Sequence, residues 1–228
     1  MKLELLIPTS LSEIPLKHYQ EFRKVAENSN DEEFVAEKMI ELFCGIELKD
    51  VIKIKASDIS DMVSHFNKLF SGKQKFEHRF KIGDLEFGFV PDLENISWGE
   101  YIDIERNLTD WDTMHKAMAA MYRPITKRKG EKYEIEEYNG TANYSDVMKY
   151  APLNVVFGAS VFFWTLGSEL LTALMDYLEK EMKGMDLTTI QNNLNLENNG
   201  DGIKAYMHSL KETLQDLTQL PENHWLSV

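Results

Sequence analysis

From Leu153 to about Met182 the chain has no strong helix breaker. Pro152 precedes it and suits the first turn of a helix, where a backbone N–H has no helical partner. The first half, LNVVFGASVFFWTLG, is apolar almost all round, whereas the second half is amphipathic. An all-round apolar helix is a buried one, and this apolar part is too short to cross a bilayer. The pattern therefore predicts a long buried helix over about 152–182 and no membrane span.

Helical patterns also dominate the first third of the chain. Apolar residues recur at helical spacing over about 16–27, over 32–44 and again before Gly72. Gly45 and Gly72 are placed to end the second and third of these helices. Together with the long run, they predict a mainly α fold.

The segment of about 76–90 has the period of a strand instead. Phe76 and Phe80 alternate with charged residues, Gly83-Asp84 is a turn dipeptide, and alternation resumes at Leu85. The pattern predicts a small antiparallel β-hairpin.

Two helix starts follow the hairpin. Ser97 and Glu100 have the spacing of a capping box, and Asp110 is predicted as the N-cap of the next helix. Arg123-Pro124 is predicted to stop that second helix, because a residue before proline avoids the helical conformation.

Changes in composition predict three regions. Residues 1–185 form a helical domain with the β-hairpin inserted, 186–202 an Asn/Gly-rich linker, and 203–228 a C-terminal helix and tail. The last helix has a narrow apolar stripe that could pack on its own domain, the favoured interpretation, or on a partner helix. The stripe and tail supply four candidate contact residues: Leu210, Leu214, Leu217 and Trp225.

Charge and cysteine content limit the function classes. The net charge of −13 and pI near 4.9 argue against direct nucleic-acid binding. Cys44 is the single cysteine, which excludes an internal disulfide, and its place beside an apolar stripe indicates an inert thiol.

The sequence contains none of the catalytic motifs GxSxG, GxGxxG and HExxH, and no Walker loop. Asp110, Asp112 and His115 have a spacing that could bring carboxylates and an imidazole together at a metal. Helix capping and the helix dipole explain the two aspartates more simply. We therefore expect no enzyme activity, no metal and no other cofactor.

A basic run followed by acidic residues, over 126–143, separates the helix predicted to begin at Asp110 from the long helix. A solvated loop is the favoured interpretation of this segment, and a β-arm that docks on a neighbouring subunit is the alternative. On the second interpretation the candidate interface residues are Arg123, Lys127, Arg128, Lys129, Lys132 and Tyr133.

Three segments resemble one group of proteins. ISWGEYIDIE (96–105), MHKAMAAMYRPITKR (114–128) and APLNVVFGASVFFWTLGSELLTALMDYL (151–178) resemble structural and assembly proteins of tailed bacteriophages, including crAss-like and related phages of Bacteroidetes hosts. The resemblance is one of helices and turns, spans about residues 16–180, and carries no catalytic residue.

The resemblance implies a virion structural protein, a ring-forming subunit of the portal-proximal neck or tail. Its partners would be other phage structural proteins and copies of itself in a homo-oligomeric ring. It would be found in the virion, and in the host cytoplasm during assembly. A tail-assembly chaperone absent from the mature particle is the alternative, and a small enzyme or regulator is a third class.

Overall fold

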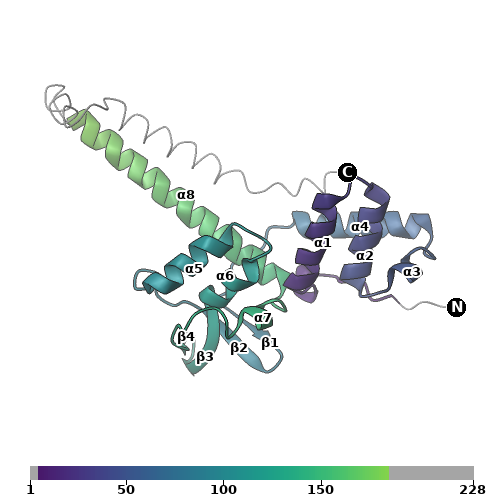
Figure 1. Ribbon diagram of the computed structural model, residues 1–228. Helices are drawn as coiled ribbons and strands as arrows, with labels where there is room; N and C mark the ends of the chain where they lie inside the picture. Colours follow the sequence, from purple (N-terminus) through teal and green to yellow (C-terminus); the bar gives the residue numbers. More distant parts are fainter. Residues whose placement is uncertain (1–4, 185–228) are drawn as a thin grey trace. The chain divides into compact units, whose positions relative to one another are not determined.

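The computed structural model describes residues 5–184 of the chain and, on its last helix, side chains as far as Leu166 together with Glu169, Thr172 and Ala173 (Figure 1). The chain divides into two compact units, Met1–Ser160 and Val161–Val228. Helix is the commonest structure in the described part, which confirms the mainly α class. The predicted linker at 186–202 and the predicted helix and tail at 203–228 lie outside the described residues.

Helices make up the first part of the first unit, after a 3-10 turn at Leu11–Glu13. Gly45 has a positive φ of 66° and ends the second helix, as predicted. The buried rings of Phe22 and Phe43 lie 5.2 Å apart, and those of Phe43 and Phe66 5.4 Å apart, so these helices share an aromatic core. The helices are α1 (Leu16–Asn28), α2 (Glu32–Cys44), α3 (Leu48–Val51) and α4 (Ala56–Ser71).

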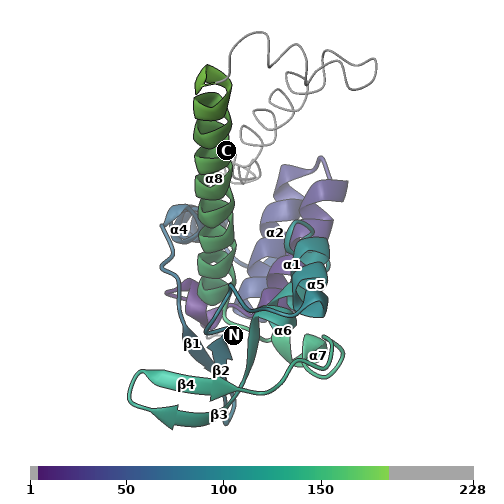
Figure 2. The same cartoon turned by 90° about the vertical axis from the view of Figure 1, so that its left-hand side faces the viewer.

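An antiparallel sheet of four strands follows, in the order β1-β2-β3-β4 (Figure 2). The predicted hairpin forms the first two strands, so the sheet is larger than the small hairpin that we predicted. The added strands occupy the segment that we favoured as a loop. The strands are β1 (Arg79–Ile82), β2 (Leu85–Phe89), β3 (Tyr122–Lys129) and β4 (Lys132–Ile135).

Pro124 explains why β3 was missed. Proline has no N–H for a ladder, so it argues against a strand in the middle of a sheet. Here β3 pairs with β2 only over Tyr122–Pro124, and with β4 only from Ile125 onward. Pro124 therefore lies where one ladder ends and the next begins, and its carbonyl still accepts a hydrogen bond from the N–H of Glu136 at 3.0 Å.

Three helices lie between or after the strands: α5 (Trp98–Leu108), α6 (Met114–Met121) and the short α7 (Ser145–Met148). The capping box that starts α5 is present as predicted. The predicted cap of α6 was wrong: the N-cap is Thr113, and Asp110 instead accepts a hydrogen bond from the N–H of Asp112 at 2.9 Å. A turn at 111–113 delays the helix start.

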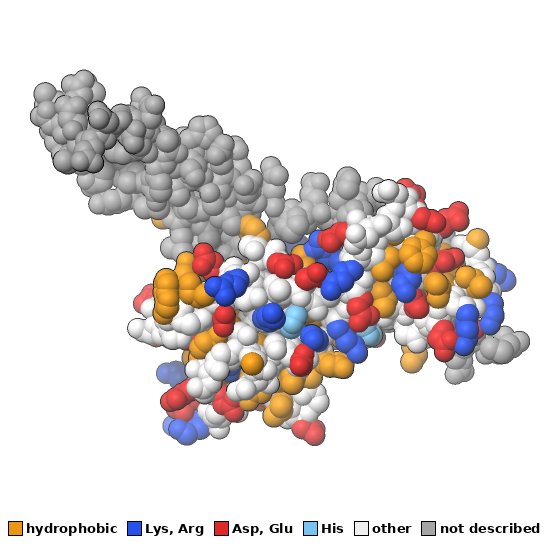
Figure 3. Space-filling view, viewed as in Figure 1, with side chains coloured by type: hydrophobic (Ala, Val, Ile, Leu, Met, Phe, Trp, Pro, Cys, Tyr) orange, Lys and Arg blue, Asp and Glu red, His pale blue; other side chains and the backbone are white. Residues whose placement is uncertain are grey.

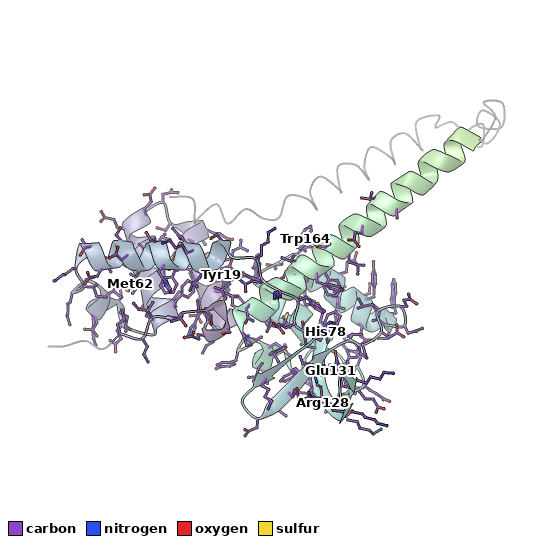
Figure 4. All side chains as sticks on the ribbon, turned by 180° about the vertical axis from the view of Figure 1, so that it is seen from behind. Tyr19, Met62, His78, Arg128, Glu131 and Trp164 are labelled. Atoms are coloured by element: carbon purple, nitrogen blue, oxygen red, sulfur yellow. The ribbon has the colours of Figure 1, made fainter. Side chains whose placement is uncertain are left out.

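An aromatic cluster joins the helices to the part of the unit that carries the sheet. The ring of Tyr19 (Figure 4) lies 5.0 Å from Trp111, 5.2 Å from Phe157 and 5.6 Å from Phe70. The Trp111 and Phe157 rings lie 5.4 Å apart. Edge-to-face pairs of this kind add to the energy of simple burial, so this cluster fixes α1, α4 and the start of α8 to one another.

Helix α8 (Leu153–Gly184) is as long as predicted but is not buried throughout. From Leu153 to Ser160 it lies in the core of the first unit, where Leu153, Val156 and Ala159 are fully enclosed. From Val161, which is 39% exposed, the described side chains are half-buried or exposed. An apolar sequence predicts that a helix is buried, but it does not show how much of the helix lies in the core of the first unit. No helix in the described part is both long and apolar enough to cross a membrane.

Replacing Gly158 with alanine is expected to destabilise the first unit. A Cβ there would overlap the carbonyl oxygen of Lys75 and lie 2.9 Å from its carbonyl carbon, and backbone cannot move aside as a side chain can. Overpacking of this kind costs about 1–3 kcal/mol. Urea unfolding followed by circular dichroism measures the change. With free space around it, the substitution would stabilise the helix by about 1 kcal/mol, so a gain in stability would contradict the close contact.

Candidate interaction surfaces

The predicted interface residues of the described part fall on the β3–β4 hairpin and do not share one environment. The hairpin projects from the unit, and Arg128 and Glu131 lie toward its outer end (Figure 4). The other four candidates, Leu210, Leu214, Leu217 and Trp225, lie outside the described residues.

Arg123 belongs to the interior and not to the exposed hairpin. Its side chain is buried, and Nη2 pairs with Glu100 Oε1 at 2.7 Å. Its Nε donates to the carbonyl of Glu136 at 2.7 Å and its Nη1 to that of Ala120 at 3.0 Å. The guanidinium also lies over the Tyr138 ring. Arg123 therefore joins the start of α5, the end of α6 and the chain that leaves β4.

Glu100 is held as a carboxylate by this arrangement. Its Oε2 accepts the Ser97 N–H at 2.7 Å, and Ser97 Oγ accepts the Glu100 N–H at 3.2 Å. Burial alone would raise the pKa of Glu100, but the Ser97 hydrogen bonds and the Arg123 guanidinium together lower it. Both carboxylate oxygens thus have partners.

Most charges of the hairpin are paired at its surface. Lys127 pairs with Glu134 at 2.9 Å, and Arg128 pairs with Glu86 of the neighbouring hairpin at 3.2 Å. Glu131 pairs with Arg79 at 2.7 Å.

Lys129 and Lys132, unlike these paired residues, have no acidic partner among the described residues. They face each other across the strands next to the turn, both are exposed, and neither forms an ion pair with a described residue. The end of the hairpin therefore carries two uncompensated positive charges.

Tyr133 is half-buried and packs on the sheet. Its hydroxyl donates to the Phe89 carbonyl at 2.9 Å, and its ring lies over Gly88, where a Cβ would come within 2.8 Å of the Tyr133 Cδ2. Glycine is therefore needed at position 88 to admit the ring.

An exposed aromatic pair on α5 is the strongest surface feature that we did not predict as an interface. Trp98 is 75% exposed and Tyr101 44% exposed, and their rings stack at 5.5 Å with an angle of 24° between their planes. Hydrophobic side chains gather over α5 in Figure 3. Tyr138 packs against the same first turn, 3.2 Å from the position of a Cβ on Gly99, and donates a hydrogen bond to Asp103.

The comparisons with known proteins add no relative. No family model matches the chain, and no match was found among the curated proteins or the solved structures.

A second apolar surface lies between the N-terminal segment and α4. An open groove of about 760 Å³ is lined there by four apolar residues, Leu5, Ile7, Ile54 and Met62, of which Met62 is labelled in Figure 4. Five charged residues line it as well: Asp50, Lys53, Lys55, Asp58 and Asp61.

The residues considered as metal ligands do not form a metal site in the described part of the chain. No group of three or more metal-binding side chains converges there. His115 Nδ1 instead lies 3.2 Å from Gln20 Nε2, which also donates to the Trp111 carbonyl at 2.6 Å. Burial, followed by the nearby Lys149, lowers the pKa of His115, so its imidazole is neutral near pH 7.

Replacing Arg123 with methionine is expected to destabilise the fold by about 3–5 kcal/mol, because Glu100 would be left buried without its partner. Adding Glu100→Gln to Arg123→Met should recover part of the loss, since the second change removes the buried charge. Urea unfolding of Arg123→Met, Glu100→Gln and the double variant measures this. Additive losses in the double variant would contradict a coupled pair.

The Cys44 thiol is expected to react slowly with alkylating reagents. Burial raises the pKa of Cys44 from 9.0 to about 11, and only the thiolate reacts. At pH 8 its alkylation should be about 100-fold slower in the folded chain than in urea, from the difference in thiolate fraction. Because Cys44 is the single cysteine, mass spectrometry over time measures the rate directly. Equal rates in the two states would indicate an open, reactive thiol.

Proposed function

We propose that this chain is a non-enzymatic structural protein of a tailed bacteriophage, a ring-forming subunit of the portal-proximal neck or tail that acts through contacts between subunits. The resemblance of residues 96–105, 114–128 and 151–178 to phage structural and assembly proteins motivates the proposal. The exposed Trp98–Tyr101 pair is the observation that supports it most directly.

Large aromatic side chains commonly act as anchors at protein interfaces, since each buries much apolar area and loses little conformational freedom. Trp98 lies within the capping box and Tyr101 directly follows it, and the Arg123–Glu100 ion pair fixes the same turn. A rigid, exposed aromatic surface is suited to a partner, because less ordering entropy is lost on binding.

The groove beside α4 supports a second candidate, the tail-assembly chaperone. Its apolar lining residues, Leu5, Ile7, Ile54 and Met62, suit an apolar segment of a client protein. A chaperone would release that client and would be absent from the mature particle.

Mass spectrometry of purified, mature particles is the test, with this protein quantified against the portal protein. We expect a fixed ratio to the portal, since a ring has a set number of subunits. Absence from particles together with abundance in infected cells would overturn the structural role and support the chaperone. Absence from both would overturn both.

A further inference from the structure

We propose that two copies of this chain contact each other head to tail: Lys129 and Lys132 at the end of one copy's hairpin dock on the surface formed by Trp98, Tyr101 and Glu105 of the next. We call Lys129 and Lys132 the hairpin tip, and Trp98, Tyr101 and Glu105 the α5 face. The inference rests on the proposed function and deepens it, since it names the partner as a second copy and assigns residues to both sides of the contact.

The hairpin tip carries unpaired positive charge. The three other basic residues of the β3–β4 hairpin, Arg123, Lys127 and Arg128, all have acidic partners, whereas Lys129 and Lys132 have none among the described residues. Both stand next to the turn at Gly130, whose φ of 63° makes the reversal tight. Two ammonium groups are thus presented together at the end of a projecting element.

The α5 face has the complementary chemistry. Trp98, Tyr101 and Glu105 are spaced i, i+3 and i+7, so they follow one side of the helix, and all three are exposed. Glu105 forms no ion pair within the described residues, and the exposed Glu94 precedes the helix start. An ammonium group binds the face of an aromatic ring, best that of tryptophan, and a nearby carboxylate strengthens the attraction. This surface therefore fits a lysine side chain better than it fits a purely apolar segment.

One copy cannot satisfy both surfaces by itself. In Figure 2 the turn of the β3–β4 hairpin lies at the lower left and α5 at the right of the unit. The two surfaces differ, so the contact between copies is heterologous. Repeated heterologous contacts form a ring if the rotation closes and a filament if it does not.

The experiment follows from this asymmetry. Full-length Trp98→Ala loses the α5 face and keeps its hairpin tip; full-length Lys129→Glu/Lys132→Glu loses the tip and keeps the α5 face. All the changed side chains are exposed, so both variants should fold as the wild type does, which circular dichroism verifies. Sedimentation velocity over a concentration series measures the masses.

We expect the wild type to form oligomers whose mass rises with concentration and falls as salt is raised from about 0.05 to about 0.5 M, because exposed charges are screened. Each variant alone should associate at least about tenfold more weakly. An equimolar mixture of the two variants should form dimers and nothing larger. Such a dimer uses the one intact tip and the one intact face, and both of its free ends are mutated.

Matched controls separate this contact from general effects. Ile52→Ala removes an apolar side chain that is 66% exposed elsewhere, and Lys73→Glu/Lys75→Glu reverses two exposed charges outside the hairpin. Both should associate as the wild type does.

Three results would each overturn the inference: a wild type that stays monomeric throughout, a Trp98→Ala variant that associates as the wild type does, or a mixture that stays monomeric. A monomeric wild type found at a fixed ratio to the portal would overturn the head-to-tail contact and leave the proposed function standing. Association in solution through these residues, with the protein absent from particles, would overturn the structural role and leave the contact standing.

Discussion

The orientation of α5 depends on the buried ion pair between Arg123 and Glu100. Burying two charges costs several kcal/mol each unless every polar atom is satisfied. Here Glu100 bonds Ser97 and Arg123, and Arg123 also bonds two backbone carbonyls, at Ala120 and Glu136. The pair therefore connects the first turn of α5 to the end of α6 and to the chain beyond β4. A loss of either partner would disturb the aromatic surface on α5, although neither charge reaches that surface.

Local signals in the sequence were sufficient for most of the helices. The capping box at Ser97 and the stop at Gly45 act through their own neighbours, so they could be predicted without knowledge of the fold. Strand β3 could not, because its pairing is not local and Pro124 is tolerated only where two ladders meet. The same holds for Arg123: within a basic run it looks like a surface residue, and only its partner on α5, far away in the sequence, shows that it is buried.

The α5 face was missed because this helix reverses the usual pattern. Its buried residues are Glu100, Ile104 and Asn107, at i, i+4 and i+7, so two of the three are polar. Asn107 is satisfied through the Asp103 carbonyl at 2.7 Å. Periodicity locates a face, and hydrophobicity normally decides which face is inside. With a satisfied carboxylate and amide inside and a tryptophan outside, hydrophobicity gives the opposite answer.

That reversal has a consequence for function. A fold that buries Glu100 and leaves Trp98 exposed forgoes the free energy that burial of the larger, apolar side chain would supply, which is about 1.5–3 kcal/mol for a large apolar residue. That free energy is gained only when a partner buries the exposed face. The lysines of a partner interact favourably with both the aromatic rings and the unpaired Glu105, whereas water solvates only the carboxylate well. The same chain carries such lysines at its hairpin tip, and their lack of acidic partners within the described unit is matched by the lack of basic partners for Glu105. Charges left unpaired on two separate surfaces, with opposite sign, are what a head-to-tail contact between copies requires.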